Sequence, residues 1–130
     1  MAWERLQPSP GGQFDAAYSA VVSDQLDAAA AAGIDVILDL HNYGRYAAPE
    51  GSLLLGSTLD GDRLTDVWMR IGEEWGEHRA LLGYGLMNEP HDLVGGDVAQ
   101  GALLWERLTQ DTVSALRAAG DDHLLLVAGY

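Results

Sequence analysis

The chain of 130 residues contains no cysteine and no lysine, and it has a single phenylalanine. Without cysteine, disulfide bonds and thiolate metal sites are excluded, and cysteine usage does not identify the redox compartment. All seven basic residues are arginine, against 20 acidic residues, which gives a formal net charge of −13. Because a binder of phosphate groups needs a basic patch, nucleic acid and anionic membrane surfaces are poor partners for this chain. A neutral or cationic substrate is compatible with this charge.

Long apolar runs are also missing from the sequence. Nothing approaches the roughly 18 uninterrupted apolar residues of a membrane-spanning helix. The N-terminal segment carries the acids Glu4, Asp15, Asp24 and Asp27, so it contains no apolar signal-peptide stretch. At this length we expect one domain, residues 1–130, with a hydrophobic core of its own.

Apolar residues recur with two different periods along the chain. Helical spacing marks residues 14–32, 64–75 and 104–116, and short apolar runs mark strands at residues 34–40, 81–87 and 123–127. Gly33 and Gly120 are suitable stops for the first and third helices. This alternation predicts an α/β fold with three parallel strands and three helices. Residues 41–58 and 88–98 are expected to be loops after the strands, where such folds place their ligands.

The first predicted strand has two different faces. Ile34, Val36, Leu38 and Leu40 share one face, which can pack under helices. The other face ends in an aspartate and a histidine, at positions 39 and 41. An apolar outer face and an inner face that becomes polar toward its end are typical of a strand in a barrel.

Residues 88–92 (Asn-Glu-Pro-His-Asp) begin where the second predicted strand ends. A carboxylate at Glu89 would project over the mouth of the sheet, and Asn88 beside it can donate to a substrate hydroxyl or to the carboxylate. Pro90 disfavours helical backbone at the preceding residue, so we expect Glu89 to be extended. The alternative is an ordinary loop in which Glu89 is solvated and the Asn and Asp residues form turns.

Residues 41–46 (His-Asn-Tyr-Gly-Arg-Tyr) follow the first predicted strand. Imidazole, amide, phenol and guanidinium groups in this segment, His41 and Tyr43 among them, can all bind a polyhydroxylated ligand. The alternative is a structured loop whose histidine and tyrosine are satisfied by backbone groups. Two such clusters at the same end of successive strands favour a binding site.

Three blocks of the sequence have a known counterpart. They are Trp-Glu-Arg-Leu-Gln-Pro at residues 3–8, Leu-Asp-Leu-His-Asn-Tyr-Gly-Arg-Tyr at residues 38–46, and Tyr-Gly-Leu-Met-Asn-Glu-Pro-His-Asp at residues 84–92. They resemble glycoside hydrolase family 5, and most of all its endo-β-1,4-glucanases (cellulases). The blocks occur in the family's order, each at the expected place in the strand–helix alternation, and the resemblance covers essentially the whole chain.

The resemblance implies roles for individual residues. Glu89 matches the general acid/base of a retaining glycosidase, and Asn88 matches the neighbour that binds the sugar 2-hydroxyl. His41 matches the histidine at the cleavage subsite. Tyr43 and His91 are further candidates for substrate binding. Trp3 is a candidate glucose platform, with a structural plug as the alternative, whereas the other three tryptophans are expected to pack in the core.

The family fold is a (β/α)₈ barrel of roughly 250 residues, so the resemblance implies a partial barrel, truncated at both ends. The nucleophilic glutamate of strand seven would lie beyond Tyr130, so the isolated chain is expected to be inactive. The implied substrate is a β-glucan, cellulose or a related polymer, and the resemblance implies no cofactor and no metal. Because such a polymer is met outside the cell, a full-length parent is expected to be secreted.

Two alternatives remain open at the level of sequence. One is a non-catalytic chain, a poorly folded truncation product or one that binds glucan without cutting it. The other is a metal-dependent barrel hydrolase with Asp39, His41, His91 and Asp92 as ligands. No His-x-His pair or His-Glu-x-x-His helix accompanies these four residues.

Overall fold

A computed structural model describes all 130 residues. In chain order the elements are α1 (Trp3–Leu6), α2 (Ala16–Ala32), β1 (Val36–Asp39), β2 (Arg45–Ala48), β3 (Gly51–Leu54), α3 (Asp62–Trp75), β4 (Leu81–Gly85), α4 (Val98–Ala118) and β5 (Leu124–Leu126). The three predicted helices and the three predicted strands are all present, at slightly different bounds. The α/β prediction is confirmed.

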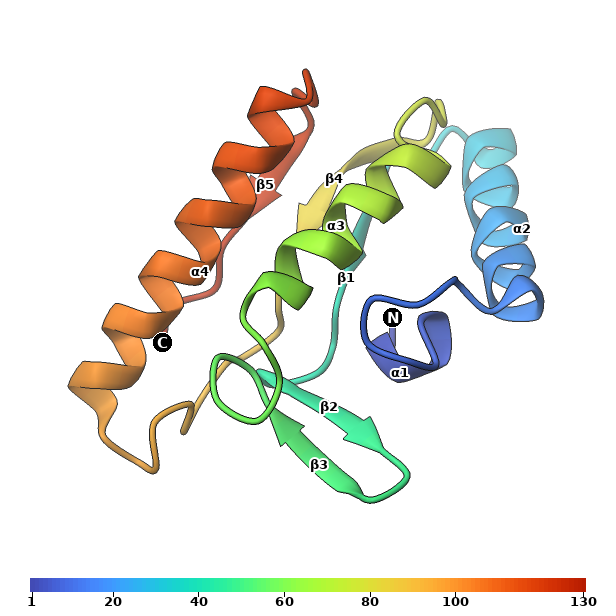
Figure 1. The fold of residues 1–130 in the computed structure, drawn as a ribbon. Helices are drawn as coiled ribbons and strands as arrows, with labels where there is room; N and C mark the ends of the chain where they lie inside the picture. The colour runs from blue at the N-terminus through green and yellow to red at the C-terminus, as the bar shows by residue number, and fades with distance from the viewer.

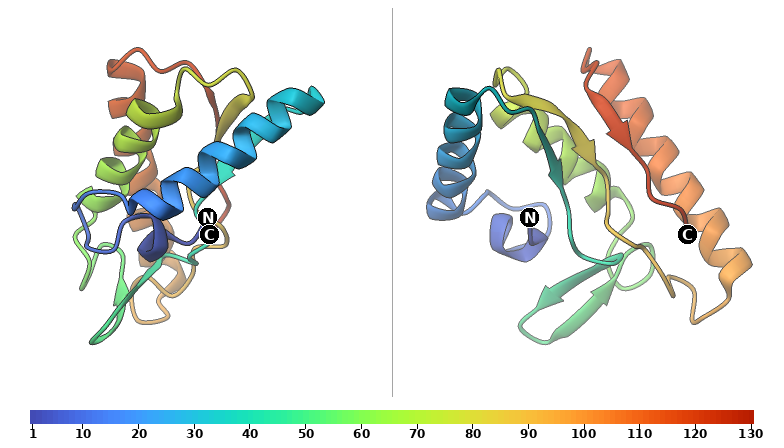
Figure 2. Two further views of the ribbon diagram at one scale, coloured as in Figure 1. Left: turned by 90° about the vertical axis from the view of Figure 1, so that its right-hand side faces the viewer. Right: turned by 180° about the vertical axis from the view of Figure 1, so that it is seen from behind.

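The central sheet has the order β1-β4-β5, and both pairings are parallel. Helices α3 and α4 lie side by side on one face of this sheet, and α2 lies on the side of β1 (Figure 1). Seen from behind, the three strands stand in front of α3 and α4, and no element covers them (Figure 2). The arrangement is that of part of a (β/α)₈ barrel, without closure.

Two of the long helices begin at an aspartate that caps them. The side chains of Asp15 and Asp97 accept hydrogen bonds from the backbone N–H of Tyr18 and Gln100, respectively. Each cap satisfies one of the free N–H groups of the first turn. Gly33, with φ of 69°, ends α2 in the left-handed conformation, as its position in the sequence predicts. The Asp97 cap also explains why α4 starts earlier than the predicted residue 104.

Residues 41–58 are not simply a loop, which corrects the sequence-based prediction. Arg45–Ala48 (β2) pairs antiparallel with Gly51–Leu54 (β3), and the hairpin extends away from the central sheet (Figure 1). Tyr46, on β2, is buried, and its hydroxyl donates to the backbone carbonyl of Gln7 at 2.7 Å. The hairpin therefore packs back on the α1 region.

The hydrophobic core lies between the sheet and the helices α3 and α4. Trp68 of α3 is fully buried, its ring centroid lies 5.1 Å from that of Tyr84 on β4, and its indole N–H donates to the carbonyl of Leu86. Trp75 and Trp105 are also buried, as predicted. Leu38 on β1 and Leu40 just after it are buried in this core. The apolar outer face predicted for this strand is confirmed at these two positions.

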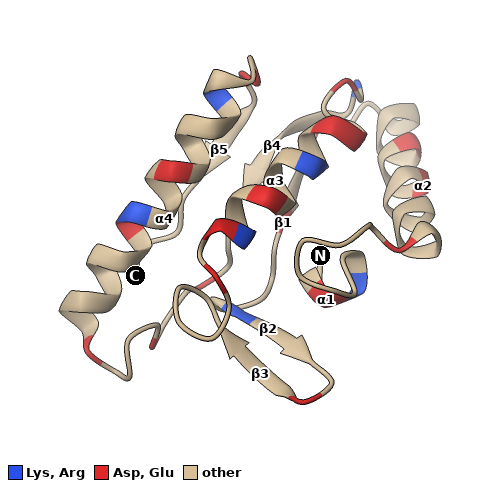
Figure 3. Ribbon diagram, in the orientation of Figure 1, with Lys and Arg blue, Asp and Glu red and all other residues tan.

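Acidic side chains are spread over the helices and the loops, and the few arginines are scattered among them (Figure 3). In this view the arginines do not form a cluster. None of the helices combines the length and the apolar character that crossing a bilayer requires.

Candidate functional site

The two polar clusters of the sequence lie at one edge of the sheet, because β1 and β4 are parallel neighbours. Beyond the strands, the backbone N–H of Leu40 donates to Gly85 and that of Asn88 donates to Leu40, at 3.2 and 2.8 Å. The N–H of Tyr43 then donates to the carbonyl of Asn88 at 3.2 Å. These bonds join residues 41–46 to residues 88–92, so the predicted juxtaposition is present.

His41 stands at the polar end of β1 and forms a pair with Asp39. Its Nδ1 lies 3.1 Å from Oδ2 of Asp39, and the two side chains are 56% and 38% exposed, respectively. Both residues point to the face of the sheet that the helices do not cover. The two-faced character predicted for the first strand is thereby confirmed at its C-terminal end.

Tyr43 stands between two histidine rings. Its ring centroid lies 5.4 Å from that of His41, edge to face, and 6.2 Å from that of His91. All three side chains are exposed. Such flat, partly apolar rings with polar atoms at their edges suit contact with sugar rings.

Arg45 holds the two loops together, a role that the sequence did not reveal. Its Nη1 donates to the backbone carbonyl of Tyr43 at 2.9 Å and to that of His91 at 3.3 Å. One guanidinium therefore fixes the spacing of the two loops. No spacing rule would have identified this contact, because the residues are far apart in sequence.

Glu89 is not extended, which corrects the expectation from Pro90. Its φ is 41°, in the left-handed region that non-glycine residues seldom adopt. Asn88 before it is held by two backbone hydrogen bonds and Pro90 after it is buried, so the chain turns within Glu89. The side chain of Glu89 is exposed and that of Asn88 is half-buried.

Only three non-glycine residues of the chain have positive φ, and all three lie in these two loops. They are Tyr43 at 55°, Glu89 at 41° and Asp92 at 53°. Strained backbone of this kind costs about 1–3 kcal/mol per residue and clusters at functional sites. The strain marks the same edge of the sheet that the polar clusters mark.

Trp3 is fully buried, and this contradicts its prediction as a glucose platform. Its indole N–H donates to Oε1 of Gln7 at 3.0 Å, and its backbone N–H donates to Oδ1 of Asn42 at 2.8 Å. The amide of Asn42 also donates to Glu4 at 2.7 Å. Since no face of the indole is open to a ligand, Trp3 is the structural plug of the alternative interpretation. Its block fastens the N-terminal segment to the end of β1.

The four residues of the metal alternative form two separate pairs, Asp39 with His41 and His91 with Asp92. No group of three or more ligating side chains is assembled from them. A catalytic zinc needs three protein ligands. The geometry therefore gives the metal-dependent hydrolase no support.

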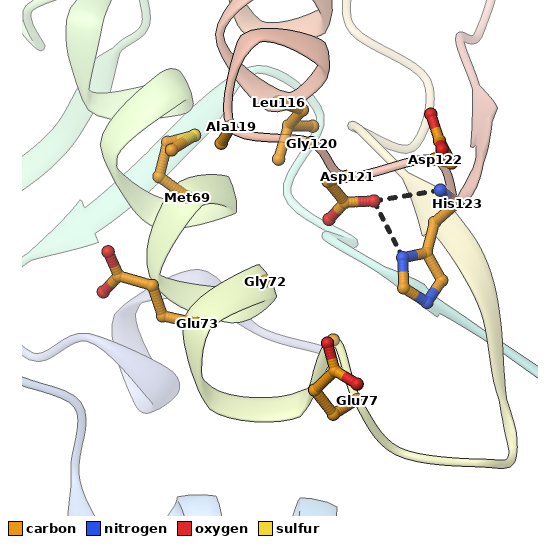
Figure 4. A pocket seen from close by; sticks show the side chains of 11 residues that line it. Met69, Gly72, Glu73, Glu77, Leu116, Ala119, Gly120, Asp121, Asp122 and His123 are labelled. Carbon is orange, nitrogen blue, oxygen red and sulfur yellow. Dashed lines mark hydrogen bonds and ion pairs between the residues drawn. The ribbon is translucent and has the colours of Figure 1, made fainter.

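The main cavities lie away from these loops. One of about 310 Å³ lies between the C-terminal halves of α3 and α4, and Asp121 and His123 line it (Figure 4). This is the end of the sheet at which β5 begins, opposite the strand ends that carry Glu89. In such folds that end stabilises the structure and the other end carries the chemistry.

The chain matches the family model for cellulase, glycosyl hydrolase family 5, over residues 1–130. It belongs to this family. Three further comparisons agree with the assignment, one with a protein sequence and two with solved structures.

The manganese dependent endoglucanase Eg5A of Phanerodontia chrysosporium is 30% identical over 130 residues, covering 98% of this chain and 31% of that protein. XacCel5A in complex with cellopentaose has a TM-score of 0.84 and 35% identity, over 99% of this chain and 38% of that chain. Endoglucanase Cel5A of Pseudomonas stutzeri, in complex with cellobiose, has a TM-score of 0.80 and 36% identity, over 96% of this chain and 35% of that chain. The family 5 chain described here thus spans about a third of the length of these relatives.

Proposed function

We propose that this family 5 chain supplies the acid/base carboxylate, Glu89, and part of the glucan-binding surface of a retaining endo-β-1,4-glucanase. The observation that carries the proposal is the coincidence of left-handed backbone with the polar residues of two adjacent strand ends. Glu89 is exposed at that edge, and the residue before it, Asn88, is hydrogen-bonded through its backbone to Leu40 and Tyr43. A proton donor needs this combination of access and fixed position.

In the proposed reaction Glu89 acts twice. It first gives its proton to the glycosidic oxygen as the bond to the anomeric carbon breaks, while a carboxylate nucleophile forms the glycosyl-enzyme. The resulting Glu89 carboxylate then takes a proton from the water that attacks this intermediate. The two carboxyl groups of such a pair lie about 5–5.5 Å apart, on opposite sides of the sugar.

The second carboxylate has no candidate among residues 1–130. Asp39 is paired with His41, and Asp92 is paired with His91 in the loop that carries Glu89. We therefore propose that the nucleophile belongs to a part of the barrel outside these residues. We also propose a secreted protein, because its polymeric substrate cannot enter a cell, and a reaction that uses no cofactor.

The substrate surface would be formed by His41, Asn88, Tyr43 and His91. Asn88 would donate to the sugar hydroxyl beside the reacting carbon, and His41 would contact the same sugar at the cleavage subsite. Tyr43 and His91 would contact neighbouring sugar units. The relatives support a β-1,4-glucan, since one is an endoglucanase by name and one was solved with cellopentaose. The charge of −13 suits an uncharged polymer better than an anionic one.

The substitution Glu89→Gln tests the acid/base role in a protein where these residues form part of a complete barrel. It keeps the shape of the side chain and removes its proton, so hydrolysis of β-1,4-glucan should fall by about 10²–10⁴-fold. A dinitrophenyl cellobioside needs no protonation of its leaving group and should keep a fast first step.

The matched control is Glu74→Gln on the exposed side of α3, which should leave the rate unchanged. A reducing-sugar assay on polymer and a burst assay on the aryl glycoside supply the two measurements. If Glu89→Gln slows polymer hydrolysis no more than Glu74→Gln does, Glu89 is not the acid/base.

A second candidate function, glucan binding without cleavage, applies to the 130 residues taken alone. They carry the exposed His41, Tyr43 and His91 rings but one catalytic carboxylate. We expect retention on cellulose in a pull-down and no release of reducing ends. Release of reducing ends that Glu89→Gln abolishes would contradict this expectation, and absence of retention would contradict the binding surface.

A further inference from the structure

The pair formed by Asp39 and His41 defines which nitrogen of the histidine carries the proton. An ionised carboxylate can only accept hydrogen bonds, and it lies 3.1 Å from Nδ1 of His41. This contact favours the neutral imidazole with its proton on Nδ1. Nε2 is then left with a lone pair, and no protein group bonds to it.

The backbone fixes both members of this pair. The N–H of His41 donates to the carbonyl of Met1 at 2.8 Å, and the carbonyl of Asp39 accepts from the N-terminal nitrogen of Met1. On the other side, Leu40 between them is bonded to Gly85 and to Asn88. The segment from Asp39 to His41 is thus held from both edges, and its alternation keeps the two side chains on one face.

Gly85 makes room for the carboxylate. It is the direct partner of Asp39 in the β1–β4 register, and a Cβ at this position would lie 2.7 Å from Oδ1 of Asp39. No real side chain tolerates that distance, so an alanine here would push the carboxylate aside. The absence of a side chain at Gly85 thus lets the Asp39 carboxylate lie where it contacts His41, and this contact orients the imidazole ring.

We propose that Asp39 is a positioning residue that holds His41 in its Nδ1–H tautomer, so that Nε2 accepts a hydrogen bond from a sugar hydroxyl. The hydrogen bond of one ring nitrogen determines whether the other is protonated. The pairing with Asp39 therefore determines whether Nε2 donates or accepts in its contact with the sugar. Tyr43, edge to face with the ring at 5.4 Å, limits rotation of His41. The site then selects a hydroxyl donor at this position and disfavours a sugar that carries fluorine or a methyl ether there.

The assignment of a sugar as the donor rests on the proposed glucanase function, whereas the tautomer does not. The tautomer is measured directly by ¹⁵N NMR of the histidine rings in the 130-residue chain, at a pH at which the spectrum itself shows neutral rings. We expect a pyrrole-type shift for Nδ1 of His41 and a pyridine-type shift for Nε2. A wild-type spectrum with the opposite pattern at His41 overturns the proposal by itself.

His78 provides an internal reference of the opposite kind. Its Nδ1 accepts from the backbone N–H of Ala80, and its Nε2 lies 3.2 Å from Oδ1 of Asp27. The same spectrum should therefore show the Nε2–H form for His78. If His78 shows the expected Nε2–H form and His41 does not show the Nδ1–H form, the NMR measurement is sound and the role assigned to Asp39 is wrong.

Two variants remove the effect of Asp39 in different ways. Asp39→Asn replaces the obligate acceptor with an amide of the same shape, and Gly85→Ala keeps every polar group but displaces the carboxylate. Both should move His41 toward the Nε2–H form. The matched control, Asp27→Asn, should change the ring shifts of His78 and leave those of His41 as they are. If neither Asp39→Asn nor Gly85→Ala alters His41, Asp39 does not position it.

A titration with cellopentaose separates the two proposals. We expect Asp39→Asn to weaken binding by about tenfold, the size of one hydrogen bond to a charged or polarised group, with Asp27→Asn unchanged. If cellopentaose does not bind the wild-type chain while His41 keeps its Nδ1–H form, the proposed glucan-binding surface of these residues is contradicted and the tautomer stands. If it binds wild type and Asp39→Asn equally, the positioning role is excluded.

Discussion

Asp121 is the residue whose surroundings have the clearest consequence for stability. It accepts hydrogen bonds from the backbone N–H of His123 at 2.9 Å, from the ring of His123 at 2.7 Å and from the hydroxyl of Tyr84 at 2.7 Å (Figure 4 shows the two from His123). Burial acts to raise the pKa of Asp121, but the bonds from His123 and Tyr84 outweigh it and hold this pKa below its usual value. Burial and the Asp121 carboxylate raise the pKa of Tyr84.

A depressed pKa in the folded state makes stability depend on pH in one direction. The contribution of Asp121 is complete above the unfolded-state pKa of about 3.9 and is lost as pH falls through the lower folded-state value. We therefore expect Asp121→Asn to lower the free energy of unfolding by about 1–3 kcal/mol at pH 7. The difference from wild type should shrink below about pH 4.

Urea unfolding at a series of pH values, at one protein concentration, measures this difference. Asp122→Asn is the control, because Asp122 is the exposed neighbour of Asp121 and should give a profile like that of wild type. A difference between Asp121→Asn and wild type that stays constant down to pH values well below about 3 would show that the carboxylate charge is not responsible.

At the scale of single residues the sequence predicted positions better than conformations. It placed His41, Asn88 and Glu89 at one edge of the sheet, because parallel strands align their ends. It gave Glu89 an extended backbone, since the rule for residues before proline is local. The hydrogen bonds of Asn88 to Leu40 and Tyr43 come from the neighbouring strand, and they override that rule. The sequence left the choice between platform and plug open at Trp3 for the same reason, because the plug role depends on Gln7 and Asn42.

At the scale of elements, long segments with clear end signals were predicted and two short strands were not. The strands 34–40 and 81–87 and all three long helices follow from apolar spacing and capping residues. The β2–β3 hairpin was missed because its four-residue strands do not alternate clearly; Leu53 and Leu54 are both half-buried. Its turn is Pro49-Glu50, followed by Gly51 at the start of β3, and this sequence also suits an irregular loop. The contact of Tyr46 with Gln7 stabilises the hairpin, and no local pattern reveals it.

The connection between the two strand-end loops can be tested at Gly44. Its φ is 74°, and a Cβ there would lie 2.6 Å from Cδ2 of Leu93, which belongs to the loop after β4. Gly44→Ala should therefore add both backbone strain and a steric clash, and destabilise the chain by about 2 kcal/mol or more. The loop that carries Glu89 should shift with Leu93.

Gly33→Ala supplies the control for backbone strain alone. Gly33 has φ of 69°, and a Cβ there would meet nothing within 4 Å. Denaturant unfolding of the two variants isolates the clash as the excess cost of Gly44→Ala, and amide shifts of residues 88–92 report whether the loop moves. Equal destabilisation by both substitutions, with unchanged shifts at residues 88–92, would mean that Gly44 does not couple the loops.

At the scale of the whole molecule, one face of the central sheet has nothing packed on it. In Figure 2 this face is turned toward the viewer in the right-hand view. Its apolar members include Ile37 on β1 and Leu124 and Leu126 on β5, which are 38%, 50% and 43% exposed. In addition, the free edge of β5 carries unpaired backbone groups, which closure into a barrel would remove.

Exposed apolar surface and an open strand edge favour association of the 130-residue chain with itself. The charge of −13 opposes this by repulsion, so we expect soluble oligomers rather than precipitate. Leu126→Glu should reduce association, because it places a charge within the apolar face. The control Leu103→Glu adds the same charge on α4, at a leucine that is 60% exposed, and should have a smaller effect. Sedimentation velocity over a range of concentrations measures both variants; a monomeric wild-type chain, or equal effects of the two substitutions, would show that the open face of the sheet does not drive association.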